Sequence, residues 1–217
     1  MQQGLRGESV YRRLRSDLLR GRIRPGDRVT EHWAAATYRV SRTPVREACR
    51  RLAEEGLLSH RPRHGYSAPL VDRREIEELY EVRRALEVLA MGRAAAAEGA
   101  RPGLLVLGRI WSGEMPAPGV EIVYRDEAFH EGLVKVGGGR VLRSTLESVN
   151  ARIRLVRVHD FLDHERIRAT VEQHLAILDA LDERDGDAAA ALMDAHITES
   201  ARVVHAAAGR ALAELWG

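Results

Sequence analysis

The sequence of 217 residues has little cysteine, little lysine, few aromatic residues and no long apolar run. A single cysteine, Cys49, excludes an intrachain disulfide and is typical of a protein whose thiol stays reduced. No apolar run approaches the ~20 residues that a membrane helix needs, and the N-terminal segment has no signal-peptide pattern. We therefore expect a cytoplasmic protein without a membrane partner.

The scarce residue types also bear on the fold class. Aromatic residues make up only 5% of the chain, and runs of β-branched residues are few, so most of the sequence favours helix over strand. Lys135 is the only lysine, which we attribute to a codon bias toward arginine and not to function. The predicted fold class is mainly α.

Charge is distributed unevenly along the chain. Residues 1–73 hold 16 arginines and 8 acidic residues, a net charge of +8, whereas the remainder has a net charge of −6. This asymmetry indicates two domains with different partners, and a polyanion is the natural partner of the basic one.

The first third has the pattern of three helices followed by a β-hairpin. Apolar residues at helical spacing predict a helix that begins near Glu8 or Ser9, a second helix over 31–37 and a third over 43–55. Two short strands, 57–61 and 65–70, would flank a turn at Pro62 to Gly65. This order predicts an N-terminal winged helix-turn-helix domain over 1–71.

The rest of the chain, 74–217, reads as an all-α helical bundle. Glycine- and aspartate-rich breaks, including Gly113 to Gly119, separate its helices. The expected helices span 74–98, 103–112, 119–136, 139–160, 164–184 and 187–214.

Several motifs resemble those of a known family of bacterial transcription regulators. The run VSRTPVREA at 40–48, with the Pro25-Gly26 turn and the later Gly65, is similar to the GntR family. Further along, Asp126-x-x-Phe129-His130 and the residues around His174 and His196 resemble the FadR-like branch, whose helical effector domain is called FCD. The resemblance implies a homodimer that binds double-stranded DNA at a short inverted-repeat operator. The first helix of the FCD part, with Leu79, Leu86 and Met91, is one candidate for the dimer surface.

The third helix carries the residue types that read DNA. Arginine bonds bidentately to guanine in the major groove, and Arg42 and Arg46 are four residues apart, so both can face one groove. Thr43 and the helix N-terminal amides suit phosphate oxygens, and Arg50 is a candidate phosphate contact. The resemblance supports Arg42 and Arg46 and adds His64 and Gly65, at the tip of the hairpin, as minor-groove contacts. A solvated arginine face is the alternative for any one of these side chains.

A candidate metal site follows mainly from the resemblance. Asp126 and His130 share one helix face, but the spacing of His174 and His196 alone carries a weak signal, because single histidines on helices are usually structural. All four positions match the ligand pattern of the FCD branch. Three imidazoles and one carboxylate suit a divalent ion, zinc first, with nickel or manganese as alternatives.

Arg83 is the candidate effector-binding residue. A buried arginine needs an anion or a carboxylate partner. Glu87, four residues later, is the structural partner, whereas the functional alternative is a small carboxylate metabolite that bridges Arg83 and the metal.

The sequence thus predicts a sequence-specific DNA-binding regulator, a repressor controlled by an organic acid held at a divalent metal. A metal-only sensor without an organic effector is the alternative within this class. A metalloenzyme fused to a DNA-binding domain is the rival from another class, but the sequence has no HExxH motif, nucleophile elbow or phosphate loop. We therefore expect no enzymatic activity.

Overall fold

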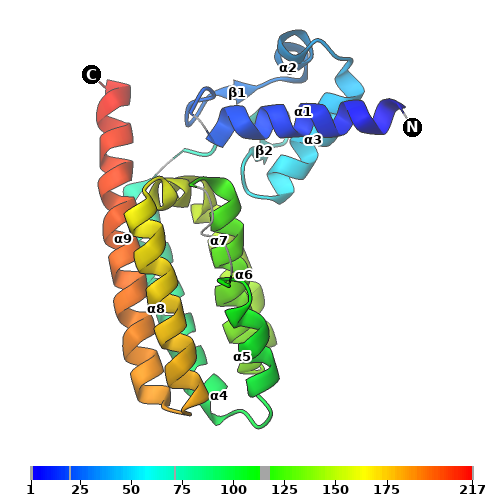
Figure 1. Cartoon of the computed structure of the whole chain (residues 1–217). Helices are drawn as coiled ribbons and strands as arrows, with labels where there is room; N and C mark the ends of the chain where they lie inside the picture. The colour runs from blue at the N-terminus through cyan, green and yellow to red at the C-terminus, as the bar shows by residue number, and fades with distance from the viewer. Residues whose placement is uncertain (1, 20, 71, 113–117, 217) are drawn as a thin grey trace. The chain divides into compact units, whose positions relative to one another are not determined.

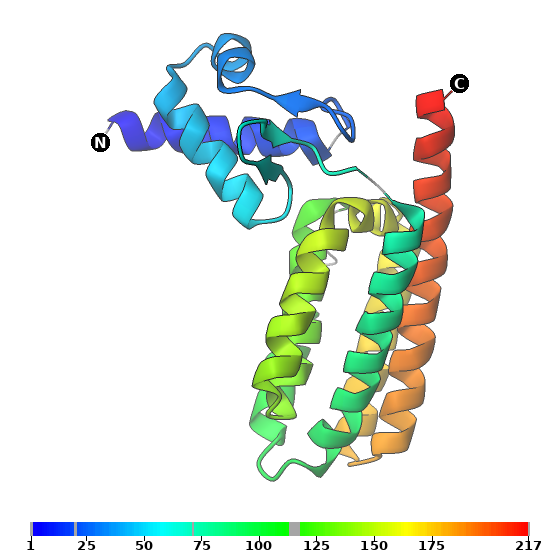
Figure 2. The same cartoon turned by 180° about the vertical axis from the view of Figure 1, so that it is seen from behind.

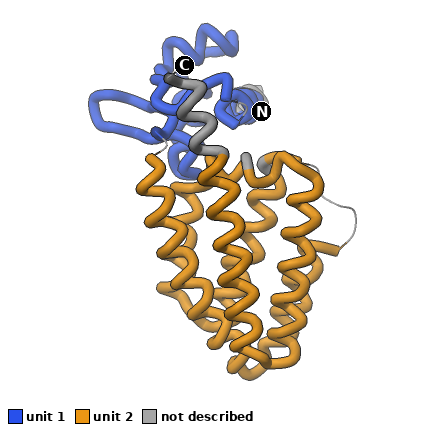
Figure 3. The backbone as a smooth tube through the Cα atoms, turned by 90° about the vertical axis from the view of Figure 1, so that its left-hand side faces the viewer, with its two compact units in different colours: residues 1–71 blue, residues 72–217 orange. Residues whose placement is uncertain are grey.

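The computed structural model describes residues 2–19, 21–70, 72–112 and 118–216 of the chain. The chain divides into two compact units, Met1–Val71 and Asp72–Gly217 (Figure 3). Each unit is built around its own apolar core.

The first unit combines three helices with a small antiparallel sheet of strand order β1-β3-β2 (Figure 1). Its elements are α1 (Gln2–Leu19), β1 (Arg28–Val29), α2 (Glu31–Tyr38), α3 (Arg42–Glu54), β2 (Ser59–Arg61) and β3 (Gly65–Ser67). Strand β3 pairs with both neighbours, Tyr66 lying opposite Val29 on one side and His60 on the other. Helix α3 packs on α1 and α2. This is the predicted winged helix-turn-helix arrangement.

The turn between α2 and α3 has a clear local origin. Thr30 caps α2 by accepting a hydrogen bond from the backbone N–H of Trp33 at 3.1 Å. Arg39 ends the helix in a left-handed conformation, with φ of 56°. Pro44 then lies in the first turn of α3, where a missing N–H costs nothing. The inner face of α3 is apolar, and its residues Val45, Cys49 and Leu52 are fully buried.

Some predicted boundaries in this unit are wrong. Helix α1 begins at Gln2 and not near Glu8 or Ser9, and the hairpin strands are shorter than expected. Strand β1 was not predicted. Its two residues are too few to show alternation, and they pair with a strand far along the chain.

The second unit is a bundle of helices (Figure 2). Its elements are α4 (Arg73–Ala96), α5 (Arg101–Gly108), α6 (Val120–Val136), α7 (Arg140–Arg157), the 3-10 helix η1 (Val158–Phe161), α8 (His164–Asp182) and α9 (Gly186–Trp216). Helix α4 packs along α9 and also contacts α6, α7 and α8. The helices thus enclose a common interior, and residues from α4, α6, α7, α8 and α9 meet there.

Two expectations for this unit need correction. The predicted helix 139–160 is divided into α7 and η1 at Arg157, which places the Arg157 side chain at the end of α7. Of the three residues expected on a dimer surface of α4, Leu79 and Met91 are buried inside the bundle and Leu86 is half-buried, whereas Val82 and Leu89 are 43% and 50% exposed. Most of the predicted break at Gly113 to Gly119 lies outside the described residues.

Among the described helices, none combines the length and apolar character needed to span a membrane.

Candidate functional site

The exposed face of α3 carries a row of basic side chains. Arg42, Arg46 and Arg50 follow one another at intervals of four residues and are all exposed, as is Thr43. The opposite face of the helix is buried in the core of the first unit. The helix is therefore anchored by its apolar side and presents its arginines to solvent.

Two residues of α2 contact two of these arginines, Arg42 and Arg46. Arg46 donates two hydrogen bonds to the Glu31 carboxylate, at 2.7 and 2.9 Å, and this pairing lowers the pKa of Glu31. Arg42 Nη2 lies 3.4 Å from His32 Nδ1. Glu31 was not predicted as part of this surface, because an acidic residue in the first helical turn also suits the helix dipole and so gives no separate signal.

The tip of the hairpin between β2 and β3 is exposed and sharply turned. His64 Nδ1 donates to the carbonyl of Pro62 at 3.1 Å, and Gly65 has a φ of 80°. A side chain at Gly65 would be strained in this conformation, so glycine keeps the tip narrow. This shape fits insertion into a DNA groove.

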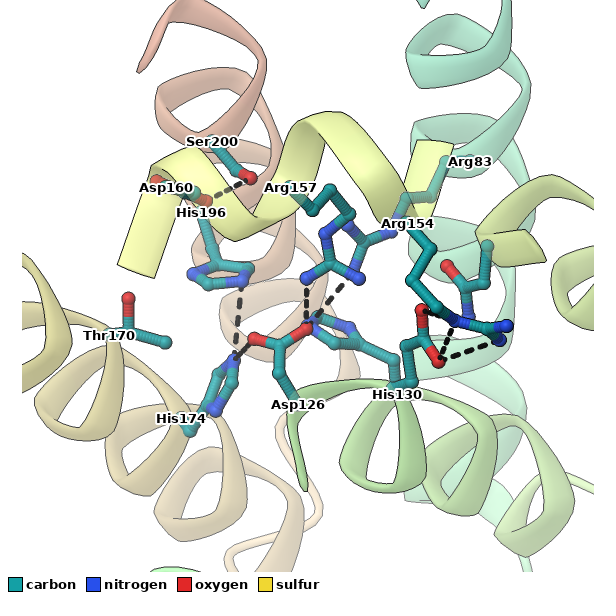
Figure 4. Close-up of polar contacts among 12 residues, drawn as sticks. Arg83, Asp126, His130, Arg154, Arg157, Asp160, Thr170, His174, His196 and Ser200 are labelled. Carbon is teal, nitrogen blue, oxygen red and sulfur yellow. Dashed lines mark hydrogen bonds and ion pairs between the residues drawn. The ribbon is translucent and has the colours of Figure 1, made fainter. Parts of the chain in front are cut away.

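In the second unit, the four predicted metal ligands meet inside the bundle. Asp126 and His130 come from α6, His174 from α8 and His196 from α9, and all four are at least 98% buried. One ligand atom from each lies within 4.8 Å of the other three. His174 Nε2 is 3.2 Å from His196 Nε2 and 3.6 Å from Asp126 Oδ1 (Figure 4).

Neighbouring side chains fix the orientation of two of the imidazoles. His196 Nδ1 donates to Gln173 Oε1 at 2.7 Å, and His130 Nδ1 donates to Glu87 Oε2. When its ring is neutral, as metal ligation requires, each Nε2 atom therefore points into the cluster with its lone pair. A ring nitrogen that donates to a carboxylate or amide oxygen while the other ring nitrogen faces inward is the usual geometry of a histidine metal ligand.

Buried atoms without a partner test whether these residues fit a cation. Asp126 Oδ1 and His130 Nε2 have no hydrogen-bond partner in the described part of the chain, and both belong to the cluster. Unpaired acceptors are costly in a buried site, and a divalent cation would satisfy them. The residues present therefore fit a metal ion.

Aromatic rings close one side of the cluster. The Phe129 ring stacks on that of His174, with centroids 4.1 Å apart, and the Trp111 ring lies 4.9 Å from the same imidazole. These contacts limit the rotation of His174 and exclude water from that side.

Two buried arginines lie on another side of the cluster. Arg83 from α4 donates through Nε to Glu87 Oε1 at 2.6 Å, so the expected structural partner is present. Arg157, at the end of α7, donates through Nη2 to Asp126 Oδ2 (Figure 4). No sequence pattern pointed to Arg157, because no motif surrounds it and only the tertiary fold turns it inward.

The electrostatics of this interior follow from burial and pairing. Burial alone would raise the pKa of Glu87, but the charges of His130 and Arg83 outweigh burial and lower it to about 2. Burial holds the pKa values of His174 and His196 well below the ordinary value for histidine. Both imidazoles are therefore neutral at physiological pH, as metal ligation requires.

Comparisons with known proteins agree with this arrangement. Residues 6–67 match the family model of bacterial regulatory proteins of the gntR family, and residues 78–199 match the FCD domain. The Nta operon transcriptional regulator of Aminobacter aminovorans is 38% identical over 179 residues. That match covers 81% of this chain and 83% of the relative's length. The HTH-type transcriptional repressor RspR of Escherichia coli K12 is 28% identical over 202 residues. That match covers 88% of this chain and 86% of RspR.

A solved structure shares the fold. The structure titled E. coli McbR/YncC has a TM-score of 0.64 and 20% sequence identity, and the match covers 92% of this chain and 96% of that one. The helix-turn-helix unit, the FCD unit and these relatives define a DNA-binding transcription regulator, not an enzyme. The chain belongs to the GntR family and carries a C-terminal FCD domain, as in FadR-like regulators.

Proposed function

We propose that this regulator is a repressor that binds an inverted-repeat operator as a homodimer and responds to a small organic acid held at a divalent metal. Residues 1–71 would contact DNA, and residues 74–217 would hold the ligands and dimerise. The naming of the relative RspR as a repressor supports this direction of control.

The proposed DNA contacts divide into base-reading and phosphate-binding groups. Arg42 and Arg46 read guanine in the major groove, and Thr43 and Arg50 bind phosphate. His64 and Gly65 enter the adjacent minor groove. The exposure of this whole set supports the proposal, since none of these side chains is needed for the core.

Asp126, His130, His174 and His196 are the proposed metal ligands. Zinc is the first candidate because it accepts a nitrogen-rich set with tetrahedral geometry, and nickel and manganese are the alternatives. A bound ion would supply a positive centre able to attract a carboxylate oxygen. The single observation that carries this proposal is the meeting of four buried ligand atoms within 4.8 Å.

Arg83 is the proposed anchor of the organic acid. Its Nε is occupied by Glu87, but Nη1 and Nη2 have no hydrogen-bond partner among the described residues. A carboxylate between these nitrogens and the metal would satisfy them. Binding would favour one arrangement of the dimer over another and so change the spacing of the two α3 helices on the operator.

A second copy of the chain is the proposed partner in solution. Two-fold symmetry in the protein would match that of the operator. Val82 and Leu89 on α4 offer exposed apolar surface, with the Arg84–Asp194 ion pair beside them.

A metal-only sensor is the second candidate function. Three histidines and one aspartate already supply four ligands, which is the full set of a closed structural zinc site. In that case the ion itself would be the signal, and no organic acid would alter operator binding.

Operator binding by the full-length protein tests these proposals together. A site selected from random double-stranded DNA would be labelled, and its affinity measured by fluorescence anisotropy for metal-loaded and metal-free protein, with and without small carboxylates. We expect a palindromic site whose affinity falls when a carboxylate is added to the metal-loaded form only. An affinity that depends on metal but on no carboxylate would favour the metal-only sensor, and a lack of sequence preference would contradict repression at an operator.

A further inference from the structure

The interior of the FCD unit contains more cationic donors than its own residues satisfy. Arg83 and Arg157 are 0% and 1% exposed. Nη1 and Nη2 of Arg83, and Nε and Nη1 of Arg157, lack hydrogen-bond partners in the described part of the chain. Buried guanidinium groups are normally paired, so these nitrogens require acceptors that the described residues do not provide.

The two guanidinium groups converge on one atom. Arg157 Nη2 donates to Asp126 Oδ2, and Arg83 Nη2 lies 3.8 Å from the same oxygen (Figure 4). Both groups can therefore contact a single small ligand beside Asp126. Arg154, one turn earlier on α7, is not part of this set, because it forms its own ion pair with Glu127.

A count of charges indicates how many negative groups the ligand carries. The two buried arginines are balanced by the carboxylates of Glu87 and Asp126. The other buried carboxylates here, Glu127 and Asp160, are already paired with Arg154 and Arg166. A divalent ion among neutral imidazoles would therefore add two positive charges that no remaining carboxylate of the described interior balances. Two more negative charges would restore neutrality, which a buried site requires.

We propose that the effector is a short dicarboxylate, with Arg157 as the anchor of its second carboxylate. This proposal rests on the proposed function, in which one carboxylate lies between Arg83 and the metal. Arg157 then determines specificity, because a monocarboxylate of the same length leaves its Nε and Nη1 without acceptors. Charge-assisted pairs of this kind are strong, so the second carboxylate increases affinity by about tenfold or more.

Trp111 provides a local reporter of binding, because its ring lies 4.9 Å from that of His174. The chain has three tryptophans, so the double variant W33F/W216F retains Trp111 alone. This protein, loaded with zinc and checked by elemental analysis, would be titrated at constant ionic strength with pairs of acids of equal carbon number. The pairs are malonate and propionate, succinate and butyrate, and glutarate and valerate.

We expect at least one dicarboxylate to bind about tenfold or more tightly than its partner acid. In the same background, loaded with zinc to the same occupancy as the parent protein, Arg157→Gln should abolish this preference while monocarboxylate affinity is retained. Arg154→Gln, on the same helix, is the matched control and should leave the preference unchanged. If Arg157→Gln does not fold, Arg157→Lys replaces it, because lysine keeps the charge. The comparison of paired acids in the parent protein still tests whether the effector is a dicarboxylate.

The outcomes separate this inference from the function on which it rests. Equal affinity for both members of every pair would overturn the dicarboxylate proposal and leave an organic acid at the metal intact. A preference that survives Arg157→Gln would overturn the role of Arg157. Failure of every acid to bind zinc-loaded protein would overturn both the inference and the organic-acid effector.

Discussion

His174 and His196 face each other through their Nε2 atoms at a distance of 3.2 Å, although they come from different helices. His196 donates its Nδ1 proton to Gln173, so its Nε2 is an acceptor. In the absence of a cation, His174 Nε2 must carry the proton and donate it to His196 Nε2. His174 Nδ1 then has no partner in the described structure. A divalent ion would accept both lone pairs and so give the two neutral imidazoles a common partner.

Replacement of Glu87 tests the support of His130. Glu87→Gln removes the carboxylate that orients His130 and also pairs with Arg83, so metal affinity should fall by about 10- to 100-fold. Competition with a metal-binding dye measures this change. Glu127→Gln is the matched control, because Glu127 is also a buried carboxylate on an arginine, and its side chain pairs with Arg154 instead of a proposed metal ligand. Equal losses in the two variants would mean that Glu87 acts on stability alone.

Replacement of Arg46 tests the base-reading role of α3. Arg46→Ala should weaken binding to the selected operator by about 10- to 100-fold and relax the preference at one base pair. Arg50→Ala should instead weaken binding to all sequences. It should also reduce the slope of the logarithm of the binding constant against the logarithm of salt concentration by about one. Anisotropy titrations on the operator and on single-base variants distinguish the two patterns. A uniform loss for Arg46→Ala would show that it contacts only phosphate.

Cys49 is expected to be inert in the folded protein. Burial, aided by the negative charge of Glu31, raises the pKa of the Cys49 thiol from 9.0 to about 12. The folded state thus favours the neutral thiol, so this group's contribution to stability is intact below pH 9.0 and falls as the pH rises toward 12.

A chromogenic thiol reagent at mildly alkaline pH tests this expectation. Labelling should be slow in native protein and fast after denaturation, because the thiolate is the reactive form. Rapid labelling of the native protein would contradict the burial of Cys49 and indicate an accessible redox site.

The sequence predicted the helical fold class well because apolar residues recur at helical spacing through most of the chain. It failed where pairing is non-local, as in β1, whose Val29 lies opposite Tyr66. Asp126 and His130 share a helix face that spacing alone reveals. The link from them to His174 and His196 depended on the family resemblance.

Residues that act through tertiary contacts were beyond sequence reasoning. Arg157 and Gln173 lie in ordinary helical segments, and nothing in their spacing indicates that one reaches Asp126 and the other His196. The pairing of Arg83 with Glu87 was foreseeable, since both lie four residues apart on one helix.

Metal content measured by elemental analysis tests the central claim most directly. Gently purified wild-type protein would be compared with His174→Ala, and with His164→Ala as a control outside the cluster. We predict about one divalent ion per chain in the wild type and in the control, and none in His174→Ala. Metal-free wild-type protein that still binds its operator would contradict the account.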